Sequence, residues 1–469
     1  MSEPQVRATT FARLEHRGVI LGLSGVQLAV VGVAAGIAVA AVYSGGSTGL
    51  LVSAPVWGVL LAAGTVSVAG RPVVRWLPLL ASWQVRRFLG VTTKATTTRD
   101  PVPNARLVVH GLAGQFDLID GATLGGVLVV DRRSGNVTGI LSVSGPGYVL
   151  ADVATQEHRV DAWGRVLASV CHQPAIVRVQ LLGRAVPSGL GAARRWWRDH
   201  TVDGGGSMAE TLAGLLDEGF VTPIRRETLL AFAVRLPRGV RRGTGLADVE
   251  TQLQAIAASL PGADLTAGGW LDRAHLTRAL RSGCEPFVAA RTEEVPLRSG
   301  TTAGIQERWA SVTVGTATHA TYWVSEWPRT ATHPGFLQPL LLGGTDVRAF
   351  SLIAEPLSTT RALREIRRAK VEYASDAAQR HRLGQVEDEA TRAEVADLER
   401  REAELVAGHG DLRFTGLLTV SAATEAELED RCLALETAAA QAMCEVRRLV
   451  GQQGVSFLAA ALPLARGVL

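Results

Sequence analysis

The residues of this chain that could carry chemistry are its histidines, cysteines and carboxylates, the usual metal ligands and acid–base catalysts. Cys171 and His172 are adjacent, so their side chains point apart on any regular element. Eight further histidines, at positions 110, 158, 200, 275, 319, 333, 381 and 409, never stand at ligand spacing from cysteines or carboxylates. We therefore predict ordinary core or surface histidines and no metal site.

The sequence also lacks the motifs that would indicate nucleotide binding or metal-dependent hydrolysis. A Walker A loop needs Gly followed by Lys, and that pair is absent, because lysine occurs only at Lys94 and Lys370. The glycines at 243–248 and 145–147 lack the third glycine of a dinucleotide turn, and there is no His-Glu-x-x-His. The sequence thus predicts no catalytic residue, no cofactor and no enzymatic activity.

One cluster of residues could bind a ligand, although no candidate catalytic residue accompanies it. It comprises Arg194, Arg195, Trp196, Trp197 and Arg198, which could clamp an anion or stack a base. A membrane-proximal or domain-interface patch fits the same residues equally well. The sequence leaves the role of this cluster open.

Composition sets the class of protein. The chain has 469 residues, a formal net charge of +4 and 47% hydrophobic residues, so it can bury more than one core and is not disordered by composition. The four cysteines, at 171, 284, 432 and 444, are too few and too scattered for a disulfide framework. We expect them to be core residues in a reducing compartment.

The residues at 18–70 include no Asp, Glu, Lys, Arg or His. A turn composition at Ser44–Gly49 divides this stretch into Val19–Tyr43 and Leu50–Val68, each close to the ~20 residues that cross a bilayer core. A transmembrane helical hairpin is predicted. A buried soluble helix pair is the alternative, but such helices usually carry a polar stripe, and Gln27 is the one large polar side chain here. Gly32 and Gly36 form a small-xxx-small face that a second helix could approach.

The basic residues flank the hairpin, and its turn is uncharged, so the positive-inside rule places residues 1–17 and everything after the hairpin in the cytoplasm. The segment 71–91 mixes aromatic and basic residues, as expected of a helix at the headgroup level. An amphipathic helix packed on the soluble part is the alternative. The predicted membrane-interface residues are Arg71, Arg75, Trp76, Trp83, Arg86 and Arg87.

After a polar linker at 92–104, strand-like and helical periods alternate, which predicts an α+β fold in two parts, 105–300 and 304–469. In the first part we predict strands at 127–131, 137–144, 175–182 and 228–236 and helices at 156–170, 209–216 and 247–260. In the second we predict strands at 309–314, 320–324, 346–354 and 412–421 and a helix at 424–443 with a capping pattern at Thr424 and Glu427.

The run 359–406 is a charged helical region in which a basic arm (361–382) precedes an acidic arm (387–404). An antiparallel helical hairpin would pair the two arms, and we prefer this reading to a nucleic-acid footprint, since acids dilute the basic arm. No direct sequence-specific nucleic-acid binding is expected.

Six segments stand in the order seen in the N-terminal, non-ATPase region of the large ATPase of type IV secretion and conjugation systems. They are Trp323–Pro328, Phe336–Leu341, Arg348–Pro356, Ala362–Lys370, Glu404–Gly410 and Phe457–Leu464. The chain resembles that region fused behind the small two-helix inner-membrane subunit, as in actinobacterial conjugation clusters. In the family, the segment equivalent to Leu462–Leu464 leads into the nucleotide-binding domain, whereas this chain stops at Leu469.

The resemblance implies a membrane-anchored α+β scaffold at the inner cell membrane, multi-pass, with cytoplasmic soluble domains. Its implied partners are membrane lipid, a separate Walker A ATPase docking near Leu462, Pro463 and Leu464, and other subunits of the secretion machine. Two alternatives stay open: a membrane subunit of another export apparatus such as type VII secretion, and a membrane-tethered enzyme.

Overall fold

The computed structural model describes residues 25–68, 71–94, 106–107, 116–200, 206–218, 224–236, 242–291, 304–328, 330, 332–344, 346–382 and 389–467. The chain divides into two compact units. We call the smaller one, Leu14–Thr92, the apolar unit, and the larger one, which contains Thr93–Leu469, the sheet unit.

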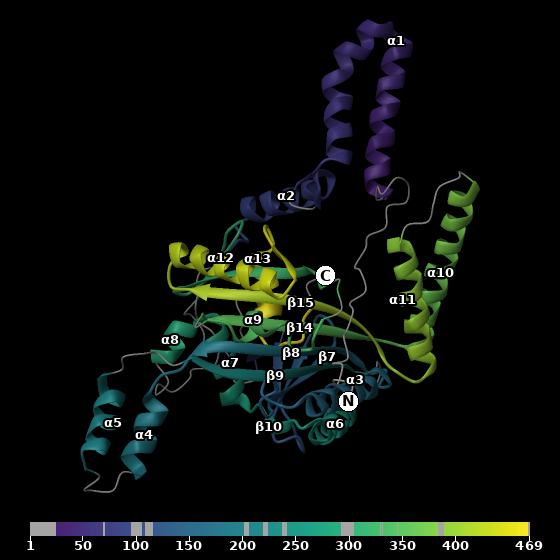
Figure 1. Cartoon of the computed structure of the whole chain (residues 1–469). Helices are drawn as coiled ribbons and strands as arrows, with labels where there is room; N and C mark the ends of the chain where they lie inside the picture. Colours follow the sequence, from purple (N-terminus) through teal and green to yellow (C-terminus); the bar gives the residue numbers. More distant parts are fainter. Residues whose placement is uncertain are drawn as a thin grey trace. The chain divides into compact units, whose positions relative to one another are not determined.

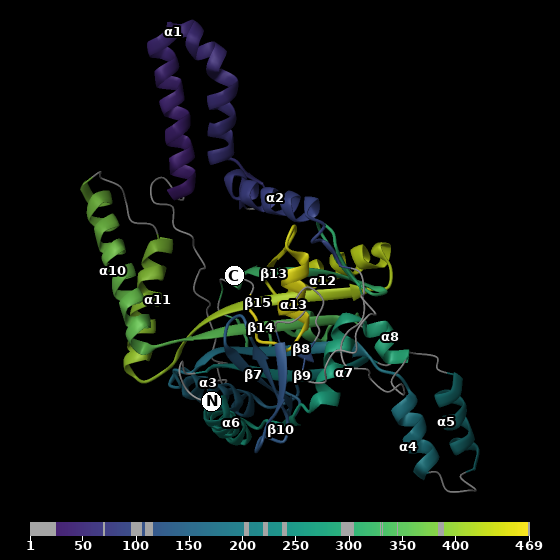
Figure 2. The ribbon, with the colours of Figure 1, turned by 180° about the vertical axis from the view of Figure 1, so that it is seen from behind.

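The apolar unit consists of a long apolar element and an amphipathic helix. Helix α1 (Gly25–Thr65) is broken at Gly46, whose φ of 55° and ψ of −142° are not helical, so it is two helical arms in sequence. The arms run side by side in both views (Figures 1 and 2). Strands β1 (Ser67–Val68) and β2 (Arg71–Pro72) pair antiparallel and lead into α2 (Val73–Phe88).

This arrangement agrees with the predicted pair of helices. The second arm ends at Thr65, three residues before the predicted end, and the predicted start of the first arm, 19–24, lies outside the described residues. The turn falls within Ser44–Gly49, as expected, because glycine tolerates the positive φ found at Gly46.

The sheet unit is built around one antiparallel sheet, which has 14 strands among the described residues (Figure 1). Its main path runs β3-β11-β12-β13-β15-β14-β8-β9-β7-β6-β5-β4, with β10 added to β7 and β16 added to β13. The two α+β parts predicted from the sequence therefore share one sheet. They meet where β8 pairs antiparallel with β14, for example Leu182 with Ser351.

The first half supplies these elements in chain order: β3 (Thr93–Lys94), β4 (Arg106–Leu107), β5 (Phe116–Asp120), β6 (Val127–Asp131), β7 (Asn136–Ser144), α3 (Val153–Cys171), β8 (Ile176–Pro187), α4 (Gly191–His200), α5 (Gly206–Glu218), β9 (Ile224–Arg235), α6 (Arg242–Ser259), the 3₁₀ turn η1 (Leu260–Ala263), β10 (Thr266–Trp270), α7 (Arg273–Cys284) and α8 (Pro286–Arg291).

The second half supplies β11 (Ile305–Glu307), β12 (Val312–Val314), β13 (Ala317–Glu326), α9 (Gln338–Leu342), β14 (Arg348–Leu357), α10 (Thr359–Arg382), α11 (Glu389–Val406), β15 (Asp411–Ala422), α12 (Glu425–Gln441), β16 (Glu445–Arg448) and α13 (Gln453–Ala461).

The two halves repeat one topology. In the first, β7, β8, β9 and β10 lie in the order β10-β7-β9-β8, and in the second β13, β14, β15 and β16 lie in the order β16-β13-β15-β14. Both are the β-α-β-β-α-β arrangement called ferredoxin-like. Each half also inserts a pair of helices between its second and third strands, α4 with α5 and α10 with α11. Because β8 and β14 are antiparallel neighbours, the halves are related by an approximate two-fold rotation.

Helices cover both faces of the sheet. On one face, α3 and α6 pack on the first half and α12 on the second, burying for example Leu253 and Leu428. On the opposite face, α7 and α13 bury Leu276, Leu280 and Phe457 against strands of both halves. Each face thus has its own core.

Capping residues fix where three of these helices begin. The side chains of Asp152, Asp272 and Thr424 accept hydrogen bonds from the backbone N–H three residues later. The capping pattern predicted at Thr424 is confirmed, with the Glu427 carboxylate accepting from the N–H of Ala423 at 3.1 Å. The predicted strands and helices are present with shifted ends. The largest shifts are in β8, which continues to Pro187 rather than stopping at 182, and in α6, which begins at Arg242 rather than at 247.

Candidate functional site

Helix α1 is long and apolar enough to cross a membrane, and it is the one such helix among the described residues. Only 11% of its most apolar stretch is buried, and Tyr43, Leu51 and Val52 are largely exposed. A soluble protein rarely leaves so much contiguous apolar surface without a partner.

One polar contact closes the two arms of α1 on each other. The side-chain amide of Gln27 donates to the carbonyl oxygen of Gly64 at 2.8 Å, and both residues are buried. A Cβ at Gly64 would lie 2.8 Å from Cγ2 of Val31, so only glycine permits this approach. The structure corrects the predicted contact face: a Cβ at Gly32 or Gly36 would meet no described atom within 4 Å.

Helix α2 carries five of the six predicted interface residues. Arg75 and Arg87 are exposed, Trp76 is half-buried, and the Arg86 guanidinium lies 5.4 Å from the centre of the Trp83 ring. Trp83 itself is only 7% exposed. Arg71 lies in β2, and its side chain is outside the described part.

Four apolar side chains, one of them aromatic as predicted for this segment, form the exposed apolar surface of α2. They are Leu77, Leu80, Val85 and Phe88. They recur at helical spacing with arginines beside them, which is the pattern of a helix lying at a membrane surface. Their apolar character could have indicated them from the sequence. Tryptophans are chosen first because they are the residues usually found at the level of lipid headgroups.

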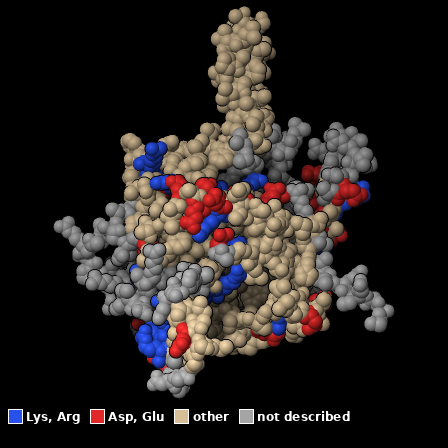
Figure 3. Space-filling view, turned by 60° about the vertical axis from the view of Figure 1, so that its left-hand side comes forward, with Lys and Arg blue, Asp and Glu red and all other residues tan. Residues whose placement is uncertain are grey.

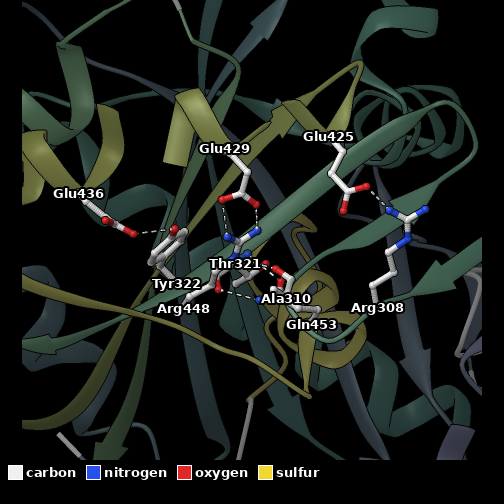
Figure 4. Close-up of polar contacts among 9 residues, drawn as sticks. All are labelled: Arg308, Ala310, Thr321, Tyr322, Glu425, Glu429, Glu436, Arg448 and Gln453. Carbon is white, nitrogen blue, oxygen red and sulfur yellow. Dashed lines mark hydrogen bonds and ion pairs between the residues drawn. The ribbon is translucent and has the colours of Figure 1, made fainter. Parts of the chain in front are cut away.

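The region expected to dock an ATPase is held by a polar network (Figure 4). Arg448 on β16 donates two hydrogen bonds of 2.9 Å to Glu429 on α12 and one of 2.7 Å to the carbonyl of Ala310. These bonds to Arg448 lower the pKa of the Glu429 carboxyl. The hydroxyl of Tyr322 on β13 donates to Glu436 at 2.9 Å, and burial raises its pKa.

The same network reaches α13. The Gln453 side chain accepts from the N–H of Thr321 at 2.8 Å and donates to its carbonyl at 3.2 Å. Arg308 also pairs with Glu425 at the first turn of α12 (Figure 4). The polar groups shown in Figure 4 therefore bind each other. Their hydrogen bonds hold α12 and α13 rigidly against the sheet.

The structure corrects the predicted docking residues. Leu462, Pro463 and Leu464 are buried, with 0% and 3% exposure for the two leucines. The Gln180 side chain of β8 holds this segment: it donates to the carbonyl of Leu462 at 3.0 Å and accepts from the N–H of Ala465 at 2.7 Å. These side chains complete the core and cannot form a surface for a partner.

The charged helices pair with each other, as predicted. Lys370 of α10 binds Glu402 of α11, and the Tyr373 hydroxyl donates to Glu394. Ala362, Ile366 and Leu405 bury a small core at their base. The two helices are therefore joined by polar contacts as well as by this small core.

The arginine–tryptophan cluster lies on α4. The Arg194 guanidinium donates to the carbonyl of Leu216 on α5 at 2.7 Å, so it links the two helices. Trp196 is 60% exposed and stacks on His200, with ring centres 4.8 Å apart. The cluster is therefore partly structural and partly exposed.

The most deeply buried histidine is enclosed in the core and has no access to a substrate. His319 has no exposed surface, and its ring nitrogens contact the Ser421 hydroxyl at 2.8 Å and the Cys284 carbonyl at 3.0 Å. Burial lowers its pKa to about 4, so the ring is neutral. Within the described ranges, no group of three His, Cys, Asp or Glu side chains could hold a metal ion.

The comparisons with known proteins add no relative. No protein-family model matches the chain, and no curated protein matches it. What the chain does must therefore be argued from its own residues.

Proposed function

We propose that this chain is a non-enzymatic scaffold subunit of a type IV-like secretion or DNA-conjugation machine. In this proposal α1 crosses the inner membrane twice, α2 lies at the cytoplasmic headgroups, and the sheet unit is a cytoplasmic platform on which a separately encoded Walker A ATPase docks. The other secretion subunits are further partners.

The observation that carries the proposal is the apolar hairpin followed directly by an amphipathic, arginine-rich helix. Two uncharged arms with exposed apolar surfaces need lipid around them. The arginines of α2 and of the N-terminal segment favour the cytoplasmic side for both ends of the hairpin.

The sheet unit supports the scaffold role because its polar networks are internally paired. In the second half, the exposed side of α12 offers an apolar anchor: Leu433 is 66% exposed beside the exposed acids Glu429 and Asp430. Protein interfaces combine an apolar centre with a polar rim, and an exposed leucine beside acidic residues fits this pattern. We therefore place ATPase docking on this side of α12, in place of the buried leucines.

The test is co-purification of the ATPase with the full-length chain from native membranes. A Leu433→Glu variant should lose the ATPase, because a charge is placed at the centre of an interface that must bury roughly 1,200 Å² or more. The matched control is Leu150→Glu, since Leu150 is 97% exposed in the first half. If Leu433→Glu keeps its ATPase and Leu150→Glu loses it, docking belongs to the other half; if no ATPase co-purifies with the unmodified chain, the scaffold role is wrong.

A further inference from the structure

The two halves of the sheet unit differ in their inserted helix pairs. In the second half, α10 and α11 bury a core of their own, which includes Ile366 and Leu405, and are joined by polar contacts such as Lys370 with Glu402. In the first half, α4 and α5 extend from the ends of β8 and β9 (Figures 1 and 2). Neither contributes to a core cluster that the described residues form. This pair therefore lacks the core that its counterpart has.

The half-buried side of α5 is made largely of small residues. Ala209, Ala213 and Gly214 are half-buried, as is Leu216. The helix is joined to α4 near its end, where the Arg194 guanidinium donates to the carbonyl of Leu216 at 2.7 Å. Because alanine and glycine have little apolar area, α5 buries little of its apolar surface within the chain.

The large apolar residues of α5 lie on another side and are exposed. They are Met208, Leu212 and Leu215, with exposed fractions of 83%, 41% and 54%. Their spacing, i, i+4 and i+7, places them in one stripe, which we call the α5 stripe. A helix that buries alanine and exposes methionine and leucine reverses the usual pattern of a soluble protein. The α5 stripe is therefore a surface that another apolar surface can cover.

The charges on α5 favour a protein over a lipid surface as the partner. Within its bounds α5 has no Lys or Arg, and its Glu210 is exposed. A helix that lies on an anionic membrane carries basic residues on its polar face, which α5 lacks. Figure 3 brings this side of the sheet unit forward, and charged groups stand there in small clusters between uncharged surface.

The rim of the α5 stripe fits a second copy of this chain. Thr211 on one side of the stripe, and Ala209 and Leu216 on the other, are uncharged. A surface that meets its own copy about a two-fold axis must avoid placing like charges together, whereas a different protein is usually selected by complementary charges at the rim. The acidic Glu218 is at the end of α5, so an axis through the middle of the stripe would keep its two copies roughly 20 Å apart.

The size of the stripe sets the strength of such a contact. Three large side chains and their rim offer roughly 500 Å² per copy, so two copies would bury about 1,000 Å², the lower limit for a specific interface. A contact of this size is weak between free molecules. It becomes effective between chains that share one membrane, because tethering raises their effective concentration.

We propose that two copies of this chain associate through the α5 stripe, with their α5 helices antiparallel about a two-fold axis near Leu212. The stripe of each copy then covers the stripe of the other, and both remove apolar surface from water. The strength of the contact rests on the membrane anchor of the proposed function, but the stripe itself does not. It shares no residue with the docking side of α12, so association and ATPase docking are independent.

The test is disulfide crosslinking of the full-length Thr211→Cys variant in native membranes, with copper phenanthroline as the oxidant. Thr211 neighbours Leu212, so the two introduced cysteines should meet near the axis and form a covalent dimer. The matched control is Glu210→Cys, an exposed position on the opposite side of the same helix. The unmodified chain measures the background of the native cysteines, three of which are buried while Cys171 is half-buried.

A second substitution tests whether the stripe holds the dimer. Adding Leu215→Glu to Thr211→Cys should reduce the yield of crosslinked dimer about tenfold, because a carboxylate would have to leave water within an apolar contact. Leu215→Ala should reduce it less. The matched control is Val371→Glu, since Val371 is 69% exposed on the charged helix pair of the second half. Thermal melting of each variant shows that it is folded.

Each outcome decides the proposal. A dimer that forms with Thr211→Cys, is absent with Glu210→Cys and is lost with Leu215→Glu supports it. No dimer, an equal yield from both cysteine variants, or a yield that Leu215→Glu leaves unchanged overturns it. An adduct with a different protein also overturns it, as does protection of the cysteine from a soluble maleimide by lipid vesicles alone. ATPase co-purification of the Leu215→Glu variant is measured separately, so a failure of the dimer is distinguishable from a failure of the scaffold role.

Discussion

The stability of the sheet unit should fall as the pH drops from 7 to 5.5, and His319 should be the cause. Its imidazole is fully buried between Ser421 and the carbonyl of Cys284, so the folded protein cannot take up a proton there until the pH is near 4. In the unfolded chain the same ring titrates at its ordinary pKa of about 6.5. The unfolded state therefore binds more protons across this window, and its free energy falls relative to the folded state.

The size of the effect follows from the two pKa values. Between pH 7 and 5.5, protonation of the unfolded ring lowers the free energy of unfolding by about 1.2 kcal/mol. Carboxyl groups contribute little in this window because they titrate lower. Denaturant unfolding of the detergent-solubilised full-length chain, followed by tryptophan fluorescence at both pH values, measures the difference.

The His319→Gln variant is the control, because its side chain keeps hydrogen-bonding capacity and cannot titrate. It should be less stable than the unmodified chain at pH 7, yet lose much less stability on acidification. Parallel pH dependence in the two proteins would refute the reasoning, since it would mean that His319 is not the group responsible.

Three further predictions concern other parts of the chain. Reporter fusions at residues 5 and 100 should both report a cytoplasmic location, and arginines added at 44–49 should hinder insertion; a translocated reporter at residue 100 would contradict the topology. Gln27→Leu should destabilise the hairpin by about 1 kcal/mol, seen as earlier thermal unfolding in detergent, because the bond to Gly64 is lost. Glu250→Gln should lower the free energy of unfolding by about 2 kcal/mol, since this buried carboxylate accepts from the N–H groups of Ala122, Thr123 and Leu124; Asp248→Asn, an exposed change on the same helix, should have little effect.

The elements with a strong local signal could be predicted from the sequence. The strands at 127–131 and 137–144 have short apolar runs around a turn, and Thr424 begins its helix with a local capping pattern. Their structure depends on residues that are close in the sequence. Hydrophobic periodicity and turn residues are therefore sufficient to predict these elements.

Long-range pairing could not be predicted in the same way. The predicted strand stops at 182, but β8 continues through Gly183 and Arg184, and Arg184 is buried by pairing with Glu227 of β9. That partner is 43 residues away, so no local pattern announces it. The repeated topology is equally hidden, because it resides in strand order and not in similar residues.

The candidate sites also differ in whether a local sequence signal or long-range packing determines them. The apolar hairpin was visible as an uncharged run, but the burial of Trp83 depends on how α2 packs. The resemblance places Leu462 and Leu464 at a docking surface, although their apolar character alone favours the core. The apolar residues of α5 are visible in the sequence, but which of them face outward depends on how α5 packs on α4.

The position of α13 has a consequence for synthesis of the chain. Gln180 is bonded to Ala465, 285 residues later, and Phe457 and Leu462 fill the core that Leu182 and Leu276 share. The ribosome therefore releases the apolar hairpin long before the last helix that closes the sheet unit can emerge. This face of the growing sheet therefore stays uncovered until α13 has been synthesised.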